Sequence, residues 1–134
     1  MARRLQPSVK TMILCEDVLP GAGGTGNVHL MNVFSEIRPQ GEPPFPYRFP
    51  ELCVFLQLTD AEGQASGRVV GRRADSGHIV FSSKDHLIHF QDRLQVKWVL
   101  FRVKDCPFPA PGLYWIESYC DGRWLADQTV TLLG

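Results

Sequence analysis

The sequence has no excess of charge of either sign, because fourteen basic residues balance fourteen acidic ones. Without net positive charge, the counterion release that drives nucleic-acid binding is missing for the chain as a whole, so we expect no nucleic-acid partner. Long apolar runs are also missing. The run nearest the N-terminus, residues 12–15, is too short for the hydrophobic part of a signal peptide or for a membrane span. These absences predict a cytoplasmic protein with no membrane attachment.

Helical periodicity and paired cysteines are scarce as well. No window of eleven residues carries an apolar stripe at helical spacing without a Gly or Pro interrupting it. None of the cysteines forms a C-x-x-C pair. In a chain without an export signal this favours buried thiols over disulfides at Cys15, Cys53, Cys106 and Cys120.

The sequence consists instead of short β-rich runs separated by turn residues, at the spacing typical of a sandwich or barrel. Residues 52–59 alternate strictly, and residues 94–103 are apolar on both faces. The last hairpin, 113–133, turns at Asp121-Gly122. We therefore predict one all-β domain over residues 1–134, a two-sheet antiparallel β-sandwich of about 7–9 strands with little or no helix. Residues 1–8 are expected to be a flexible N-terminal segment, and 83–93 is the best place for a single helical turn.

Two segments rich in proline or glycine are expected to be loops. Residues 39–50 hold five of the ten prolines, which predicts an extended loop rather than a strand. The glycine-rich segment 21–26 invites a phosphate-binding interpretation. A phosphate loop, however, needs a Gly-Lys-Ser/Thr ending and a following helix, whereas a strand-like run follows here and no Lys is present. We interpret it as a flexible hairpin connection.

Several segments resemble an uncharacterised family of small bacterial proteins that is labelled only as a domain of unknown function. They are residues 12–17, 32–37, 49–55 and 107–114, with Asp121-Gly122 following, so the resemblance covers about residues 12–132. It implies a β-sandwich and no particular activity. The Pro-Gly-x-Tyr…Asp-Gly hairpin at the end also resembles the final two strands of immunoglobulin-like sandwiches.

Catalytic and metal-binding patterns are weak. His86 and His89 are three residues apart, which places them on opposite faces of a strand. They could approach His78 and Asp85 only if the 83–93 segment folded back, so solvated or hydrogen-bonded histidines are the preferred interpretation. The neighbouring carboxylates Glu16-Asp17, and Glu117 with Asp121, are interpreted as solvated charges at strand ends. No cofactor motif is present, and we expect neither a cofactor nor a metal.

Aromatic residues form the most distinctive pattern. Rings alternate with prolines in the 39–50 loop, and Pro44-Phe45-Pro46 recurs as Pro107-Phe108-Pro109. These segments either cap the open ends of the sandwich or form a binding rim, since rigid aromatics bind at a low entropic cost. In the last hairpin, Tyr114 and Ile116 are expected to point inward, and the opposite face would then mark an interface or a sugar-type platform. The candidate interaction surface is Phe45, Tyr47, Phe49, Phe108, Trp115, Tyr119 and Trp124.

Two hypotheses of function follow. The preferred one is a non-enzymatic binding or scaffolding domain whose partner is another protein or a second copy of the chain. It rests on the apolar residues of both faces of 52–59 and 94–103, since a sandwich buries only one face of each sheet and loops or a second subunit must cover the other. The alternative is an enzyme or a small-ligand or metal binder, with a loop-end site near residues 78–89.

Overall fold

The computed structural model describes residues 6–21 and 26–134 of the chain. Most of the predicted flexible N-terminal segment lies outside the described residues, and the first strand already begins at Ser8. Residues 22–25, the middle of the predicted glycine-rich connection, also lie outside them.

The described residues form ten β-strands and no helix, which confirms the predicted fold class. The strands are β1 (Ser8–Pro20), β2 (Val28–Val33), β3 (Glu36–Ile37), β4 (Tyr47–Thr59), β5 (Gly63–Arg73), β6 (Ile79–Ser82), β7 (His86–Phe90), β8 (Lys97–Phe108), β9 (Gly112–Cys120) and β10 (Arg123–Leu132). One sheet has the order β2-β1-β4-β8. The other has the order β3-β10-β9-β5-β6, with β7 also paired to β5. Accordingly, no helix in this part of the chain is long and apolar enough to cross a membrane.

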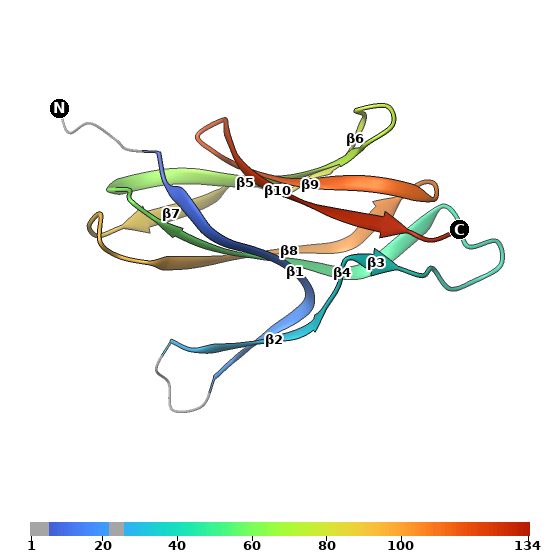
Figure 1. Cartoon of the computed structure of the whole chain (residues 1–134), viewed down its shortest axis with the longest axis horizontal. Coiled ribbons are helices and arrows are strands. Elements are labelled where there is room, and N and C mark those ends of the chain that lie inside the picture. The colour runs from blue at the N-terminus through green and yellow to red at the C-terminus, as the bar shows by residue number, and fades with distance from the viewer. Residues whose placement is uncertain (1–5, 22–25) are drawn as a thin grey trace.

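The two sheets face one another and enclose the main core (Figure 1). The alternation of β4 was predicted correctly, because Leu52, Val54, Leu56 and Leu58 are all buried in this core. Tyr114 and Ile116 of β9 also point inward, as predicted, and are almost fully buried. Every second residue of these strands therefore contributes to one continuous apolar interior.

The outer face of the four-stranded sheet is partly covered by the chain itself. In Figure 1 the β1–β2 hairpin bends away from the sandwich and runs below that sheet. There Val28 and Leu30 of β2 pack against a second cluster that contains Cys15 and Cys53. The second apolar face noted in the sequence is thus covered in part by a hairpin, while Trp98 on the same face remains 42% exposed.

Four details of the fold differ from the sequence predictions. The ten strands exceed the predicted range, and the sandwich is not entirely antiparallel, because β3 pairs with β10 in parallel.

The 83–93 segment holds strand β7 instead of a helical turn, since Ile88 and Phe90 alternate into the core. The proline-rich stretch becomes strand β4 from Tyr47 onward. This is tolerated because β1 pairs with β4 only from Cys53, so Pro50 lies in a segment with a neighbouring strand on one side.

Candidate functional site

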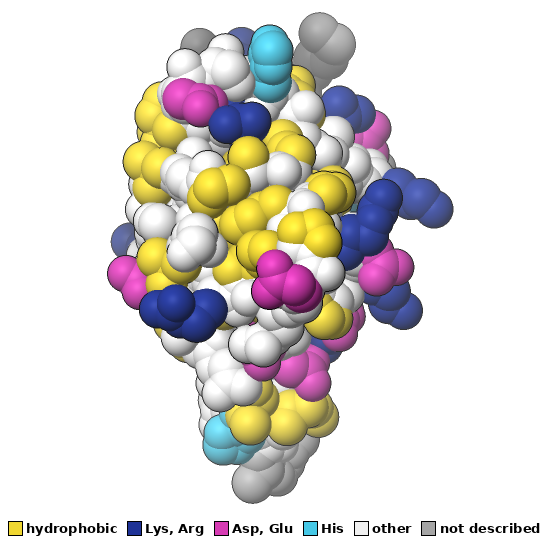
Figure 2. Space-filling view, turned by 90° about the vertical axis from the view of Figure 1, so that its right-hand side faces the viewer, with side chains coloured by type: hydrophobic (Ala, Val, Ile, Leu, Met, Phe, Trp, Pro, Cys, Tyr) yellow, Lys and Arg dark blue, Asp and Glu magenta, His cyan; other side chains and the backbone are white. Residues whose placement is uncertain are grey.

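The proline-rich segments meet at one end of the sandwich. Figure 2 looks at this end and shows hydrophobic and proline side chains gathered near its middle, with charged side chains around them. Pro46, Tyr47, Val80 and prolines 107 and 109 line a shallow hollow of about 540 Å³ here, together with Arg48.

The aromatic side chains at this end pack mainly into the hydrophobic core. Phe108 is fully buried and lies edge-on to Tyr114, with 5.0 Å between the ring centroids. Phe49 is 6% exposed and stacks on Phe34 at 5.1 Å. Phe45 and Tyr47 are half-buried and pack against the same core. Phe49 and Phe108 therefore offer almost no surface to a protein partner, although Phe49 borders a cavity described below.

The remaining predicted residues lie together on the outer face of the six-stranded sheet. Tyr119 of β9 pairs there with Trp124 of β10, and Trp115 lies on the same face four residues earlier in β9, with Glu117 between them. Their exposure differs: Trp115 is 37% exposed, Trp124 is 52% exposed and Tyr119 is half-buried. We call Arg72, Trp115, Glu117, Tyr119 and Trp124 the tryptophan face.

A hydrogen-bonded network fixes the middle of the tryptophan face. Nε of Arg72 lies 3.0 Å from Oε1 of Glu117, and the Tyr119 hydroxyl donates to the same oxygen at 3.1 Å. Arg72 also donates to the carbonyl of Gly77 at 2.8 Å. The hydrogen bond to Glu117 raises the pKa of Arg72, so the guanidinium stays charged. Glu117 is thus not the solvated strand-end charge that the sequence suggested, and the network holds the rings beside it in place.

A hollow of about 530 Å³ lies beside the tryptophan face, on the side of β5. Arg68 and Asp85 form an ion pair of 2.9 Å at its edge, while Val70 and Ile79 give it an apolar part. The arrangement offers flat aromatic and guanidinium surfaces next to a depression.

The histidines of the alternative hypothesis are not brought together. His86 lies edge-on to Phe101 at 5.4 Å, whereas the backbone carbonyl of His89 accepts a hydrogen bond from Nζ of Lys97 at 2.7 Å. Over the described residues, no group of three or more His, Cys, Asp or Glu side chains is placed to hold a metal ion. All four cysteines are buried thiols, as predicted.

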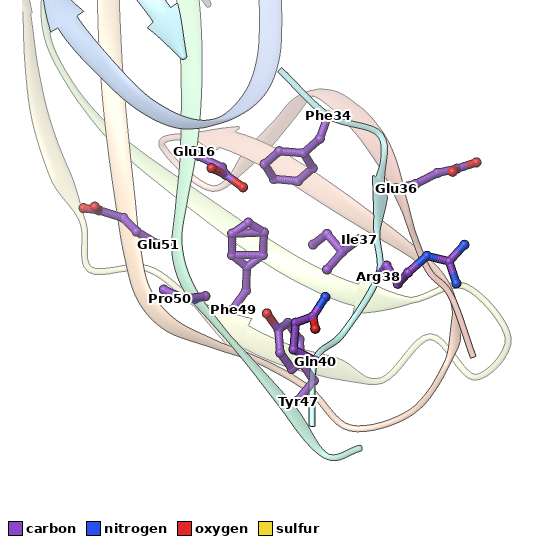
Figure 3. Close-up of a pocket in the computed structure, with 10 residues that line it drawn as sticks. All are labelled: Glu16, Phe34, Glu36, Ile37, Arg38, Gln40, Tyr47, Phe49, Pro50 and Glu51. Carbon is purple, nitrogen blue, oxygen red and sulfur yellow. The ribbon is translucent and has the colours of Figure 1, made fainter. Parts of the chain in front are cut away.

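A second candidate site lies where the chain crosses from β2 to β3. This cavity of about 430 Å³ is drawn in Figure 3. The rings of Phe34 and Phe49 and the side chain of Ile37 face its middle, with Tyr47 and Gln40 at one end. Its other lining residues are Glu16, Glu36, Arg38, Pro50 and Glu51.

The carboxylates that line the cavity differ in their hydrogen-bond partners and in the direction in which they point. Nδ2 of Asn32 donates to Oε2 of Glu16 at 2.9 Å, and Figure 3 shows Glu16 directed toward the two rings. The carboxylate of Glu51 lies 3.5 Å from Nη1 of Arg102. The carboxylate of Glu36 and the guanidinium of Arg38 point away from the middle. The cavity therefore combines an aromatic floor with one carboxylate aimed at it.

Sequence reasoning found only part of these sites. The prolines alternating with rings drew attention to Tyr47 and Phe49, but not to a cavity. Glu16 was interpreted only as a solvated charge, and Phe34 was not considered as a site residue, because only the fold places their segments beside Phe49. Arg72 was missed for the same reason, since its partner Glu117 is 45 residues away.

The chain belongs to DUF6941, a family of unknown function whose model matches residues 10–132. This confirms the predicted family resemblance at that level. No curated protein matches the sequence.

Solved structures resemble the sandwich alone. A β-glucosidase from Listeria innocua in complex with glucose superposes with a TM-score of 0.53 and 12% identity, over 96% of this chain and 16% of that chain. The alkylpurine DNA glycosylase AlkC of Pseudomonas fluorescens, bound to DNA with an abasic site analog, gives a TM-score of 0.52 and 12% identity, over 96% of this chain and 30% of that chain. The chain therefore spans less than a third of either structure, and these likenesses show the fold only.

Proposed function

We propose that this chain is a non-enzymatic protein-binding domain that engages its partner through the tryptophan face. The observation that carries the proposal is the pair of exposed indoles, Trp115 and Trp124, on either side of the fixed Arg72–Glu117–Tyr119 network. Trp, Tyr and Arg are the residues in which binding energy concentrates at protein interfaces.

The rigidity of the tryptophan face also supports a protein-binding function. Each ring of the tryptophan face stands on a strand of the larger sheet, paired on both sides in the case of β9. Because the hydrogen bonds to Glu117 already hold Tyr119 and Arg72, a partner would restrict few side chains when it binds. A preorganised surface of this kind suits recognition of a folded protein surface better than it suits catalysis.

The test is site-specific photo-crosslinking in the native cells. A photoreactive amino acid replaces Thr129, which is exposed and pairs with Trp115 across β9 and β10, so both indoles stay in place. The matched control carries the same group at Lys104, an exposed position of β8 in the other sheet. We expect a defined cross-linked species from position 129 only, and its loss when Trp115→Ala and Trp124→Ala are added.

The mass of the cross-linked species identifies the partner. Twice the 15.1 kDa of one chain would mean self-association through this face, and any other mass would mean a different protein. A product that survives the double tryptophan substitution, or one that forms equally from position 104, would refute the tryptophan face as the binding surface.

Three further features stay predictions. We infer that the final hairpin is immunoglobulin-like, and the support is a tyrosine near the start of β9 that bonds back to the chain, as in the tyrosine corner of such domains. The Tyr114 hydroxyl donates to the Ala110 carbonyl at 2.6 Å and accepts from the Ala110 amide at 3.2 Å. A bacterial source and a cytoplasmic location also remain expectations.

A further inference from the structure

We propose that the cavity of Figure 3 binds an organic cation, a primary ammonium or guanidinium group carried on a short apolar chain. This site goes beyond the protein-binding function and does not rest on it, because the cavity is built from β1, the β2–β3 crossing and the start of β4, whereas the tryptophan face lies on β5, β9 and β10.

The floor of the cavity suits a cation with an apolar stem. The rings of Phe34 and Phe49 are stacked with 23° between their planes, so each covers one face of the other, and the accessible aromatic surface belongs mainly to the half-buried Phe34. Ile37 and Tyr47 extend this apolar surface. A cation over an aromatic face is attracted by the electron-rich centre of the ring, while its alkyl stem is removed from water.

Glu16 supplies the charge that such a group would meet. Its carboxylate is directed toward the rings and is held by Asn32 through Oε2 only. Among the residues that the structure describes, no donor is hydrogen-bonded to Oε1. Asn32 itself lies in the left-handed backbone region, at φ 53°, directly across the β1–β2 ladder from Glu16. One oxygen of a positioned carboxylate is therefore left to accept from an ammonium or guanidinium group.

The orientation of the charges favours a cation over an anion. Of the three carboxylates that line the cavity only that of Glu16 is directed toward its middle, and the guanidinium of Arg38 points away from it. Glu51 is partly neutralised by Arg102, so the net attraction for a cation centres on Glu16. A volume of about 430 Å³ lies within the range of small-molecule sites.

The experiment is a titration of the ¹⁵N-labelled full chain followed by NMR, with n-butylguanidinium as the probe. Its neutral control is n-butylurea, which has nearly the same shape. With about eight heavy atoms, the cation should bind with a Kd of roughly 1–10 mM. The amides that shift should be those of the cavity, residues 16, 34–38, 47–49 and 51, whereas butylurea at the same concentration should move them at least fivefold less.

Two variants separate charge from shape. Glu16→Gln keeps the size of the side chain and should weaken binding about tenfold, because it removes a charge-assisted hydrogen bond. Its matched control is Glu62→Gln, an exposed carboxylate in the turn before β5, which should leave the Kd unchanged. Phe34→Leu should weaken binding about threefold by removing one aromatic face. Because Glu16 is exposed, its variant keeps the fold even if the Phe34 variant does not.

The Kd of the tripeptide Gly-Arg-Gly, measured in the same way, identifies the source of the cation. If the tripeptide binds at least tenfold more tightly than butylguanidinium, the natural ligand is an arginine side chain presented by a protein. If the two Kd values are equal, the natural ligand is a free small molecule. Either result supports the site. Equal binding of butylguanidinium and butylurea, shifts confined to amides outside the cavity, or an unchanged Kd in Glu16→Gln would overturn it.

Discussion

An aromatic ring leaves no room for a side chain at Gly71 of β5. It pairs with Phe81 of β6, and the Phe81 ring lies where a side chain of residue 71 would begin. A Cβ built at this position would stand 2.5 Å from Cδ1 and 2.7 Å from Cζ of Phe81, and closer still to Cε1. No ordinary carbon contact is that short, so alanine at 71 and the present position of the ring exclude one another.

The cost of Gly71→Ala follows from what the ring must give up. Overpacking a well-filled site costs about 1–3 kcal/mol. Displacing the half-buried Phe81 from the main core loses part of the ~1.5–3 kcal/mol that full burial of such a ring provides. The greater backbone freedom of unfolded glycine returns about 0.5–1 kcal/mol to the alanine variant. We expect a net loss of about 1–3 kcal/mol, which in a domain of this size corresponds to a fall in Tm of roughly 3–10 °C.

A double-mutant cycle isolates this clash. Urea unfolding is measured for the wild type, Gly71→Ala, Phe81→Ala and the double variant. With the ring absent, alanine at 71 meets no clash and should cost close to zero, so the two substitutions should couple by about 1–3 kcal/mol. If Gly71→Ala cost the same in both backgrounds, within about 0.5 kcal/mol, the clash with Phe81 would not be its cause.

Three further predictions concern single side chains. Tyr114→Phe removes both hydrogen bonds to Ala110 and should lower the free energy of unfolding by about 1–3 kcal/mol in urea titrations; an unchanged value would mean that the hydroxyl contributes nothing. Arg102 bonds the Val18 carbonyl at 3.1 Å and lies 3.4 Å from Sγ of Cys53, so Arg102→Met should loosen the β1–β2 hairpin. A thiol reagent should then label Cys53 faster than in wild type, while equal rates would contradict this role. Burial raises the pKa of the Cys53 thiol from 9.0 to about 11. The unfolded chain therefore loses this proton first as pH rises, and the thiol's contribution to stability is present below pH 9 and lost between about 9 and 11. The Tm of wild type should fall more steeply across this window than that of Cys53→Ala, and parallel curves would refute the shift.

Local patterns in the sequence were enough to predict the sandwich. The strict alternation of 52–59 and the Asp-Gly turn at 121–122 report directly on which side chains point inward and where a hairpin closes. Strand β7 escaped prediction because its signal is only five residues long and is surrounded by polar residues. Whether a ring such as Phe108 caps the core or faces solvent depends on neighbours distant in sequence, and periodicity carries no information on those.

The crossing from one sheet to the other explains why a cavity lies where it does. After β2 the chain leaves the four-stranded sheet, and the Phe34 amide still donates to Leu14 of β1 at 3.2 Å. One residue later, the carbonyl of Ser35 already accepts from Thr131 of β10, at 2.9 Å. Two residues thus span the open side of the sandwich, too few to fill it with side chains. Phe34 is anchored to one sheet and stacks on Phe49, so its ring lines the cavity of Figure 3 and is not part of a closed core. A cavity at this side therefore follows from the connectivity, and the residues that line it determine what it binds.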